Sequence, residues 1–280
     1  MKNYKDGHFT GERALFNIHD AKIDNCLFDD GESPLKEGSN LNVINTTFGW
    51  KYPLWYGKNH KVADCKFLDT ARAGVWYTFD STFNNCDFVA PKLFRRCKNI
   101  TIKDAKFSDA LETMWFCEDI KLENIKIQGN YFALHSNNIE ADNIVLNGDY
   151  GFDSCENVKI SNSILNTKDA FWNCKNVTIS NCIIKGEYFS WNSENITLID
   201  STIISHQGFC YMKNIKLINC KVIDTDLAFE YCEDIDADIK SSFASIKNPI
   251  NGRIVVDKVD EVIFDDPKID KNKTEIIFRS

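Results

Sequence analysis

The stretch CKNVTISNCII at residues 174–184 decides the fold, because its pattern recurs along most of the chain. It returns as CENVKISNSIL at 155–165, CEDIKLENIKI at 117–127 and CKNITIKDAKF at 97–107. We number each unit from its first residue, position zero. That slot lies at Ile18, Gly38, Gly57, Thr78, Cys97, Cys117, Ser136, Cys155, Cys174, Ser193, Met212 and Cys232. An internal repeat with a step of mostly 19 or 20 residues therefore organises the chain.

Each unit contains a corner followed by a short strand. Position +2 is Asn or Asp in most units, and Asn tolerates the left-handed backbone of a tight corner. Behind it, Val177 and Ile179 alternate with polar residues, which is the period of a half-buried strand. Short strands joined by corners at this step predict a β-solenoid. A leucine-rich repeat stays open as the rival, because C-x-x-V-x-I-x-x-C at 174–182 fits its spacing, although no unit offers a helical arm.

The eleven cysteines follow the repeat rather than a metal motif. No pair is spaced as C-x-x-C, so the usual zinc, iron–sulfur and thioredoxin-type signatures are absent. We therefore expect reduced, buried cysteines that pack as small apolar residues, with no metal and no cofactor.

Charge and hydropathy exclude several classes of protein. The chain has 280 residues, with 33 basic and 41 acidic side chains and a net charge of −8, and no basic stripe that would bind nucleic acid. No apolar run is long enough for a membrane span, and the N-terminus lacks a secretory signal. These features predict a soluble, cytoplasmic protein with no nucleic-acid or membrane partner. They do not decide whether it forms a homo-oligomer.

Several non-repeated strings are specific enough to indicate a family. WKYPLWY at 50–56, ARAGVWYT at 71–78, DAFWNC at 169–174 and GEYFSWNS at 186–193 resemble the bacterial domain of unknown function 3737. The resemblance covers essentially residues 9–280 and implies a single-stranded right-handed β-helix similar to pectin-lyase-like proteins. It implies no established activity. The label "putative hydrogenase" that some members carry conflicts with the missing C-x-x-C pairs, so we do not expect a hydrogenase.

Together, the repeat and the resemblance predict an all-β protein built as a parallel β-helix of about twelve coils. Residues 1–248 are expected to form the right-handed β-helix with an N-terminal cap. Residues 249–280 are expected to hold the last coil and a C-terminal capping segment, because open solenoid ends need cover. The whole chain is interpreted as one domain.

One face of the predicted helix departs from the repeat. We interpret the seven residues before position zero as a strand whose −3 side chains face the core, so that period two turns −2 and −4 outward. Position −4 is mostly small. Position −2 holds five of the six tryptophans: Trp55, Trp76, Trp115, Trp172 and Trp191. Arg95, Asp153 and Glu230 interrupt that column, which suggests a shallow aromatic and charged groove.

This face carries the functional hypothesis. Aromatic rings beside hydrogen-bonding charges suit sugars, so we expect a carbohydrate or sugar conjugate as ligand. The expected binding residues are the five tryptophans together with Arg72, His135 and Glu230. The alternative is a non-catalytic scaffold whose face docks a protein partner or a second copy. A purely structural aromatic cover also remains open.

The sequence does not decide whether the protein is an enzyme. Pectin-lyase-like folds support β-elimination and hydrolysis, so an enzyme would resemble a polysaccharide lyase or a glycoside hydrolase. The candidate catalytic residues are Arg95, Glu112, Asp153, Asp169 and Glu187. A calcium ion between Asp149, Asp153 and Asp169 is a further open alternative.

Overall fold

The structure, a computed structural model, describes residues 2–279 and is almost entirely β. Its strands, β1 to β25, pair in parallel, and the described residues form no α-helix, only the short 3₁₀ helix η1 (Lys271–Lys273). The chain divides into two compact units, Met1–Val145 and Leu146–Ser280, which we describe separately. None of the helices in this described part is long and apolar enough to cross a membrane.

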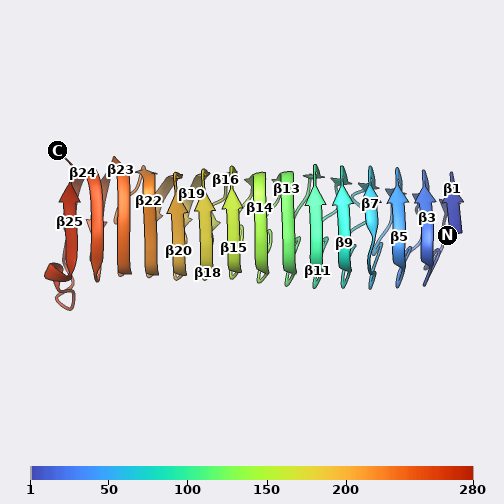
Figure 1. The fold of residues 1–280 in the computed structure, drawn as a ribbon, viewed down its shortest axis with the longest axis horizontal. Helices are drawn as coiled ribbons and strands as arrows, with labels where there is room; N and C mark the ends of the chain where they lie inside the picture. The colour runs from blue at the N-terminus through green and yellow to red at the C-terminus, as the bar shows by residue number, and fades with distance from the viewer. Residues whose placement is uncertain (1, 280) are drawn as a thin grey trace. The chain divides into compact units, whose positions relative to one another are not determined.

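Unit 1 repeats a longer strand and a short strand in each coil up to β12, and β13 and β14 merge the two into single strands of 11 residues. In Figure 1 the long strands β3, β5, β7, β9 and β11 stand side by side and point the same way. The strands of unit 1 are β1 (Lys2–Lys5), β2 (His8–Phe9), β3 (His19–Asp24), β4 (Leu27–Phe28), β5 (Ser39–Ile44), β6 (Thr47–Phe48), β7 (Lys61–Ala63), β8 (Lys66–Phe67), β9 (Phe79–Asn84), β10 (Asp87–Phe88), β11 (Lys98–Lys103), β12 (Lys106–Phe107), β13 (Glu118–Gln128) and most of β14 (Asn137–Asn147).

Unit 2 continues the pattern with longer strands. Its strands β18, β20, β22 and β23 again pair in sequence order (Figure 1). They are β15 (Glu156–Ser161), β16 (Ile164–Asn166), β17 (Asp169–Ala170), β18 (Lys175–Ser180), β19 (Ile183–Phe189), β20 (Glu194–Ile199), β21 (Thr202–Gly208), β22 (Lys213–Ile223), β23 (Glu233–Lys247), β24 (Gly252–Ile263) and β25 (Thr274–Phe278).

The strand register follows the repeat. Ile100 pairs with Ile120, and Val177 pairs with Ile196, so equivalent residues of successive coils form columns. The predicted parallel β-solenoid is confirmed, and the leucine-rich alternative is wrong because no coil contains a helical arm. The described chain makes about 15 turns rather than twelve, because β1 and β2 precede the first slot and β24 and β25 follow the last. Whether residues 249–280 act as a cap stays a prediction.

Aromatic stacking fills the core of several coils. In unit 1, Phe28 and Phe48 stack with ring centroids 5.5 Å apart, and Phe88 and Phe107 stack at 4.5 Å. Coils stacked in parallel place equivalent side chains one strand spacing apart, which brings flat rings within contact distance. The core is therefore a column of like residues.

Polar ladders hold the corners. The Asn59 amide donates to Asn40 at 2.8 Å, and Asn195 donates to Asn176 at 2.9 Å, so the predicted +2 ladder is present. A second ladder at +7, which the sequence analysis did not single out, includes Asn181, whose amide donates to Asn162 at 2.7 Å. These asparagines have φ between 52° and 58°, the left-handed region that Asn tolerates. These corner asparagines thus form their side-chain hydrogen bonds with equivalent asparagines of the neighbouring coil.

Position zero is a buried hydrogen-bond donor as well as a small residue. The Cys174 thiol lies 2.9 Å from the Phe152 carbonyl oxygen, and the Ser193 hydroxyl donates to the Phe171 carbonyl at 2.8 Å. This shared bond explains why Cys, Ser and Thr alternate in the slot. All eleven cysteines are buried, as predicted, and free. Burial raises the pKa of the Cys174 thiol to about 12, which makes the thiolate scarce.

Candidate functional site: the aromatic face

The backbone before position zero is not the predicted strand in unit 1. Tyr52, Leu54 and Tyr56 have φ of 62°, 58° and 56°, so every second residue is left-handed. The segment is nevertheless hydrogen-bonded to its neighbours, because the Leu54 amide donates to Pro34 at 3.0 Å and the Tyr56 amide to Trp76 at 2.9 Å. The interpretation of this face as one strand per coil is therefore wrong here. It is a ladder of left-handed turns.

This backbone changes which side chains face outward. The −3 side chains Leu54 and Val75 are fully buried, as predicted. Position −4 is also buried, for example at Pro53 and Gly74, so the expected groove lined by small outward residues is wrong. Strict alternation belongs to a pleated strand, and left-handed residues at every second position abolish the pleat. The side chains at −2 and −1 reach the surface, as do residues at −5 and −6 such as Tyr52 and Arg72.

In unit 1 the −2 column is a continuous stack. The rings of Trp55 and Trp76 are 5.3 Å apart and inclined by 10°. The Arg95 guanidinium lies 5.0 Å from the Trp76 ring centroid and 4.4 Å from that of Trp115. A guanidinium between two indoles gains cation–π attraction on both faces. Arg95, which appeared to interrupt the column, therefore continues it.

The indole N–H groups of the three −2 tryptophans of unit 1 have backbone acceptors. Trp55 Nε1 donates to the Ala73 carbonyl at 2.5 Å, and Trp76 Nε1 donates to the Lys92 carbonyl at 2.7 Å. Trp115 Nε1 repeats the bond, at 2.7 Å, to the carbonyl of Tyr131. Each acceptor is the −5 residue of the next coil. These tryptophans are thus tied into the wall by stacking and by hydrogen bonding.

Glu112 anchors the arginine of that stack. Its carboxylate accepts from Arg95 at 2.6 Å and lies 3.2 Å from the Lys92 ammonium. Partial burial alone would raise the pKa of Glu112, but the bonds from Arg95 and Lys92 outweigh it, and the pKa is lowered. Glu112 is therefore held as an anion, which suits an anchor better than a general acid. Within this network the Arg95 Nε remains buried without a partner.

A second aromatic row lies beside the first at position −1. Tyr56 and Tyr77 stack at 4.8 Å, and Phe116 stacks on His135 at 5.2 Å. Tyr56 is 48% exposed and Phe116 is 45% exposed, so this row is the more accessible one. The sequence analysis singled out only His135 from it. Arg72, the other expected binding residue here, is exposed.

At Trp172 and Trp191 in unit 2, the backbone differs at position −5. Trp172 and Trp191 stack at 5.5 Å with an interplanar angle of 6°. The −5 residues Asp169 and Tyr188 lie in strands β17 and β19, and neither has a positive φ. The Tyr188 ring packs 4.9 Å from Trp191 and 6.5 Å from Trp172. Asp169 and Tyr188 are strand partners, so their side chains lie next to each other on the same side.

We call Asp169, Trp172, Tyr188 and Trp191 the Tyr188 cluster. Its polar atoms are poorly satisfied: Asp169 Oδ1, Trp172 Nε1 and Trp191 Nε1 are buried and have no hydrogen-bond partner. Asp169 is only 3% exposed. Burial raises the pKa of Asp169, Lys168 counteracts the shift, and Glu187 and Asp149 add to it. The adjacent Ser190 hydroxyl is also buried and unpartnered.

The remaining acidic candidates of unit 2 have partners. Glu187 lies 3.2 Å from the Lys168 ammonium, and Asp153 accepts from the Ser154 hydroxyl at 2.8 Å. Glu230 lies 3.2 Å from the Lys247 ammonium and accepts from Gln207 at 3.0 Å. Within residues 2–279, no three acidic, histidine or cysteine side chains are arranged to hold a metal ion, so the calcium alternative finds no support.

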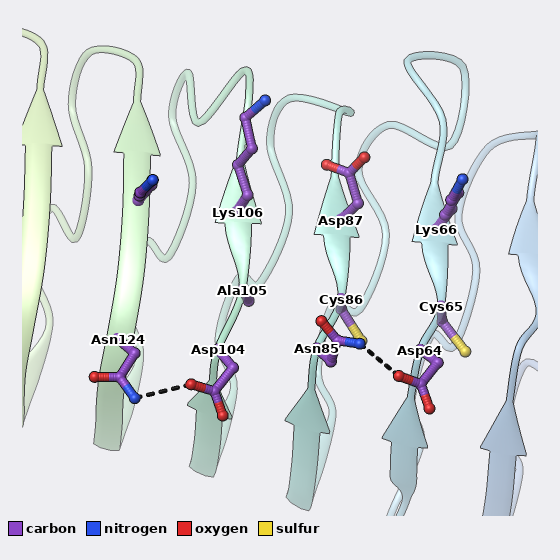
Figure 2. A pocket seen from close by; sticks show the side chains of 11 residues that line it. Asp64, Cys65, Lys66, Asn85, Cys86, Asp87, Asp104, Ala105, Lys106 and Asn124 are labelled. Atoms are coloured by element: carbon purple, nitrogen blue, oxygen red, sulfur yellow. Dashed lines mark hydrogen bonds between the residues drawn. The ribbon is translucent and has the colours of Figure 1, made fainter.

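A shallow cavity of about 570 Å³ lies elsewhere in unit 1, along the +7 to +9 columns. Figure 2 shows Asp64 accepting from Asn85 on one side of it and Asp104 accepting from Asn124 on the other. Asp87 pairs in register with Lys66 and Lys106, yet its Oδ1 is buried without a partner. The sequence analysis did not single out this cavity, whose small slot residues Cys65, Cys86 and Ala105 create the space. The cavity is therefore lined by side chains of both charges, lysines and aspartates.

Among the comparisons with known proteins, a family model covers nearly the whole chain. The family described as "Protein of unknown function (DUF3737)" matches residues 2–277. No curated protein matches significantly. Among solved structures, the chain is similar to the A-module of mannuronan C-5 epimerase AlgE4 from Azotobacter vinelandii, at 9% identity and a TM-score of 0.35, over 99% of this chain and 89% of that one.

Two further solved structures are also similar. HetL, a pentapeptide repeat protein from Nostoc sp. strain PCC 7120, matches at 7% identity and a TM-score of 0.21, over 81% of this chain and 86% of its own. The fluoroquinolone resistance protein QnrB1 matches at 12% identity and a TM-score of 0.21, over 96% of this chain and 91% of its own. Nothing about activity follows from similarities this low.

Proposed function

The chain belongs to the DUF3737 family of proteins of unknown function, and from this premise we propose that it binds a carbohydrate or sugar conjugate at the Tyr188 cluster. The observation that supports the proposal is the set of unsatisfied polar atoms beneath a partly exposed aromatic surface. Leaving a buried donor or acceptor unpaired costs about 1–3 kcal/mol. Several such groups in one patch are therefore expected to have a partner in the working protein.

Sugar hydroxyls are suited to these atoms. A hydroxyl both donates and accepts, so neighbouring hydroxyls can serve the Asp169 carboxylate and the indole N–H groups of Trp172 and Trp191 together. The apolar C–H surface of the same sugar packs on aromatic rings. A ligand with only acceptors or only donors would leave half of the cluster unsatisfied.

The ring geometry determines how a sugar would enter. Trp172 and Trp191 stack face to face, so their edges rather than their faces are available. Tyr188 is partly exposed and contacts both rings, and it neighbours Asp169 in the register. In this proposal the Tyr188 ring turns aside, and the sugar takes its place against the indole edges.

Binding rather than catalysis is proposed. Arg95 and Lys92 hold Glu112 as an anion, and Lys168 pairs with Glu187. Arg95 is sandwiched between indoles, so it is poorly placed to act as a mobile base. The other residues expected to bind lie outside the Tyr188 cluster: Trp55, Trp76, Trp115, Arg72, His135 and Glu230. Their binding role is a separate prediction, and the Trp55 variant described next tests it.

A glycan array followed by titration calorimetry on the full chain tests the proposal. Trp172→Phe and Trp191→Phe remove the indole N–H groups and keep an aromatic ring, so each should weaken the captured glycan at least about tenfold, or ~1.4 kcal/mol. Trp55→Phe is the matched control in unit 1 and should leave affinity unchanged. No captured glycan, or equal losses in the control, would contradict the proposal.

A second candidate function has its own observation, the exposed −1 row of unit 1. Tyr56 and Phe116 present aromatic surface that the fold does not bury. Exposed apolar patches of this kind often mark protein-binding surfaces. Tyr56→Ser with Phe116→Ser should then abolish concentration-dependent self-association in sedimentation experiments. A wild-type chain that stays monomeric at all concentrations would rule out self-association as the role of this row.

A further inference from the structure

Resting on the proposed function, we infer that the Tyr188 cluster selects an amino sugar, that is, a sugar carrying a protonated amine. The inference concerns the charge of the ligand, which the proposal above leaves undefined. It rests on three features of the cluster: a buried carboxylate oxygen without a hydrogen-bond partner, the negative groups around it, and the mixture of donors and acceptors.

The first feature is Asp169 itself. It is 3% exposed, and its Oδ1 has no hydrogen-bond partner among residues 2–279. Burying a carboxylate is costly unless the charge is paired and hydrogen-bonded. An ammonium group supplies both the charge and the donors that this oxygen lacks.

The second feature is the electrostatic surroundings of Asp169. Asp149 and Glu187 both add negative potential at its carboxyl group. Lys168, the nearest counter-charge, is held 3.2 Å from Glu187, so its charge is shared. A cationic ligand gains from this potential, whereas a uronic acid would bring a carboxylate against Asp169.

The third feature distinguishes an amino sugar from a simple amine. Trp172 Nε1 and Trp191 Nε1 need acceptors, which an ammonium cannot offer and sugar hydroxyls can. An amine and hydroxyl groups on one ring therefore match the whole cluster.

Titration calorimetry with three oligosaccharides of equal length tests the inference: oligomers of glucosamine, of N-acetylglucosamine and of galacturonic acid. The wild-type chain at slightly acidic pH should bind the glucosamine oligomer at least about tenfold more tightly than the N-acetylated one. The galacturonic acid oligomer should bind weakest. Asp169→Asn should remove the preference for the free amine while retaining N-acetylglucosamine binding.

Asp87→Asn is the matched control, because Asp87 also has a buried, unpartnered Oδ1 but lies in unit 1. It should leave all three affinities unchanged. Equal or tighter binding of the N-acetylated oligomer at the cluster would overturn the inference and leave the proposed function standing. A preference that survives Asp169→Asn would also overturn it. If none of the three oligosaccharides binds, both the inference and the proposed function are contradicted. If Asp169→Asn fails to fold, the comparison of the three ligands on the wild-type chain still tests the inference.

Discussion

The −2 tryptophans of unit 1 and unit 2 occupy the same repeat position but meet different surroundings. Trp55, Trp76 and Trp115 each donate to the −5 carbonyl of the next coil. Trp172 and Trp191 have no such acceptor, although their rings stack just as closely. The difference teaches that a repeated residue is structural or available for binding according to the backbone one coil away.

The backbone difference is local to position −5. In unit 1 the −5 residues Ala73 and Lys92 are left-handed, whereas Tyr188 continues strand β19. That strand runs very close to the preceding coil at Gly186, where an added Cβ would lie 2.1 Å from the Thr167 carbonyl oxygen. Only glycine permits this approach. Extending the strand changes the peptide orientation at −5 and removes the acceptor that unit 1 offers to its tryptophans.

The largest expected effect is the loss of stability when a −2 tryptophan of either unit is truncated to alanine. Trp76→Ala should destabilise the protein by ~3–5 kcal/mol, because it removes a stacked indole, its hydrogen bond and one face of the Arg95 sandwich. Trp172→Ala should cost at least ~1 kcal/mol less, since no hydrogen bond is lost. Denaturant unfolding of both variants measures the difference. Equal losses would show that the two columns support the fold in the same way.

The next largest expected difference between the units is the dependence of their stability on pH. His60, in unit 1, is buried with both ring nitrogens unpartnered, and burial lowers its pKa from 6.5 to about 4. The unfolded chain then takes up the proton first, so stability is lost as the pH falls from about 6.5 to 4, by ~3 kcal/mol in total. Hydrogen exchange at several pH values should show the loss in unit 1.

The control for this titration is His60→Leu, which matches Leu41 at the equivalent core position of a neighbouring coil. The variant should flatten the acid dependence of unit 1 between pH 6.5 and 4. An unchanged acid dependence would mean that another group carries it.

The smallest expected effect is the change in stability when a tryptophan is replaced by phenylalanine, which removes the indole N–H and keeps an aromatic ring. Trp55→Phe should cost about 1–2 kcal/mol, since the buried Ala73 carbonyl loses its donor. Trp172→Phe should be close to neutral, because the lost N–H has no partner in the structure. Thermal unfolding of the two variants side by side measures the contrast. A Trp172→Phe variant as unstable as Trp55→Phe would contradict the assignment of an unsatisfied donor.

Much of the fold could be predicted from the sequence because its causes are local and periodic. The slot cysteines, the +2 asparagines and the buried −3 residues each recur once per coil, and a recurring residue must occupy a recurring environment. The +7 ladder is equally periodic in the sequence, for example at Asn162 and Asn181, so its position is local information as well. The five tryptophans were correctly grouped in one column.

The direction of position −4 could not be predicted in the same way. The interpretation assumed a pleated strand, yet residues such as Val75 adopt φ of 56°, a region that β-branched residues rarely enter. Inter-coil hydrogen bonds hold them there, for example from the Val75 amide to Pro53 at 2.7 Å. Those bonds exist only after the coils have stacked.

The sequence by itself determined the parallel solenoid, its step, its corners and the tryptophan column, because each follows from residue type and spacing along the chain. Only the tertiary structure decided that Arg95 belongs to the stack and that Asp169, Trp172 and Trp191 lack partners. The physical reason is that hydrogen-bond satisfaction depends on the neighbouring coil, roughly 19 residues away in sequence. Spacing can place side chains in one column, but the backbone beside that column decides which of their polar atoms remain unpaired.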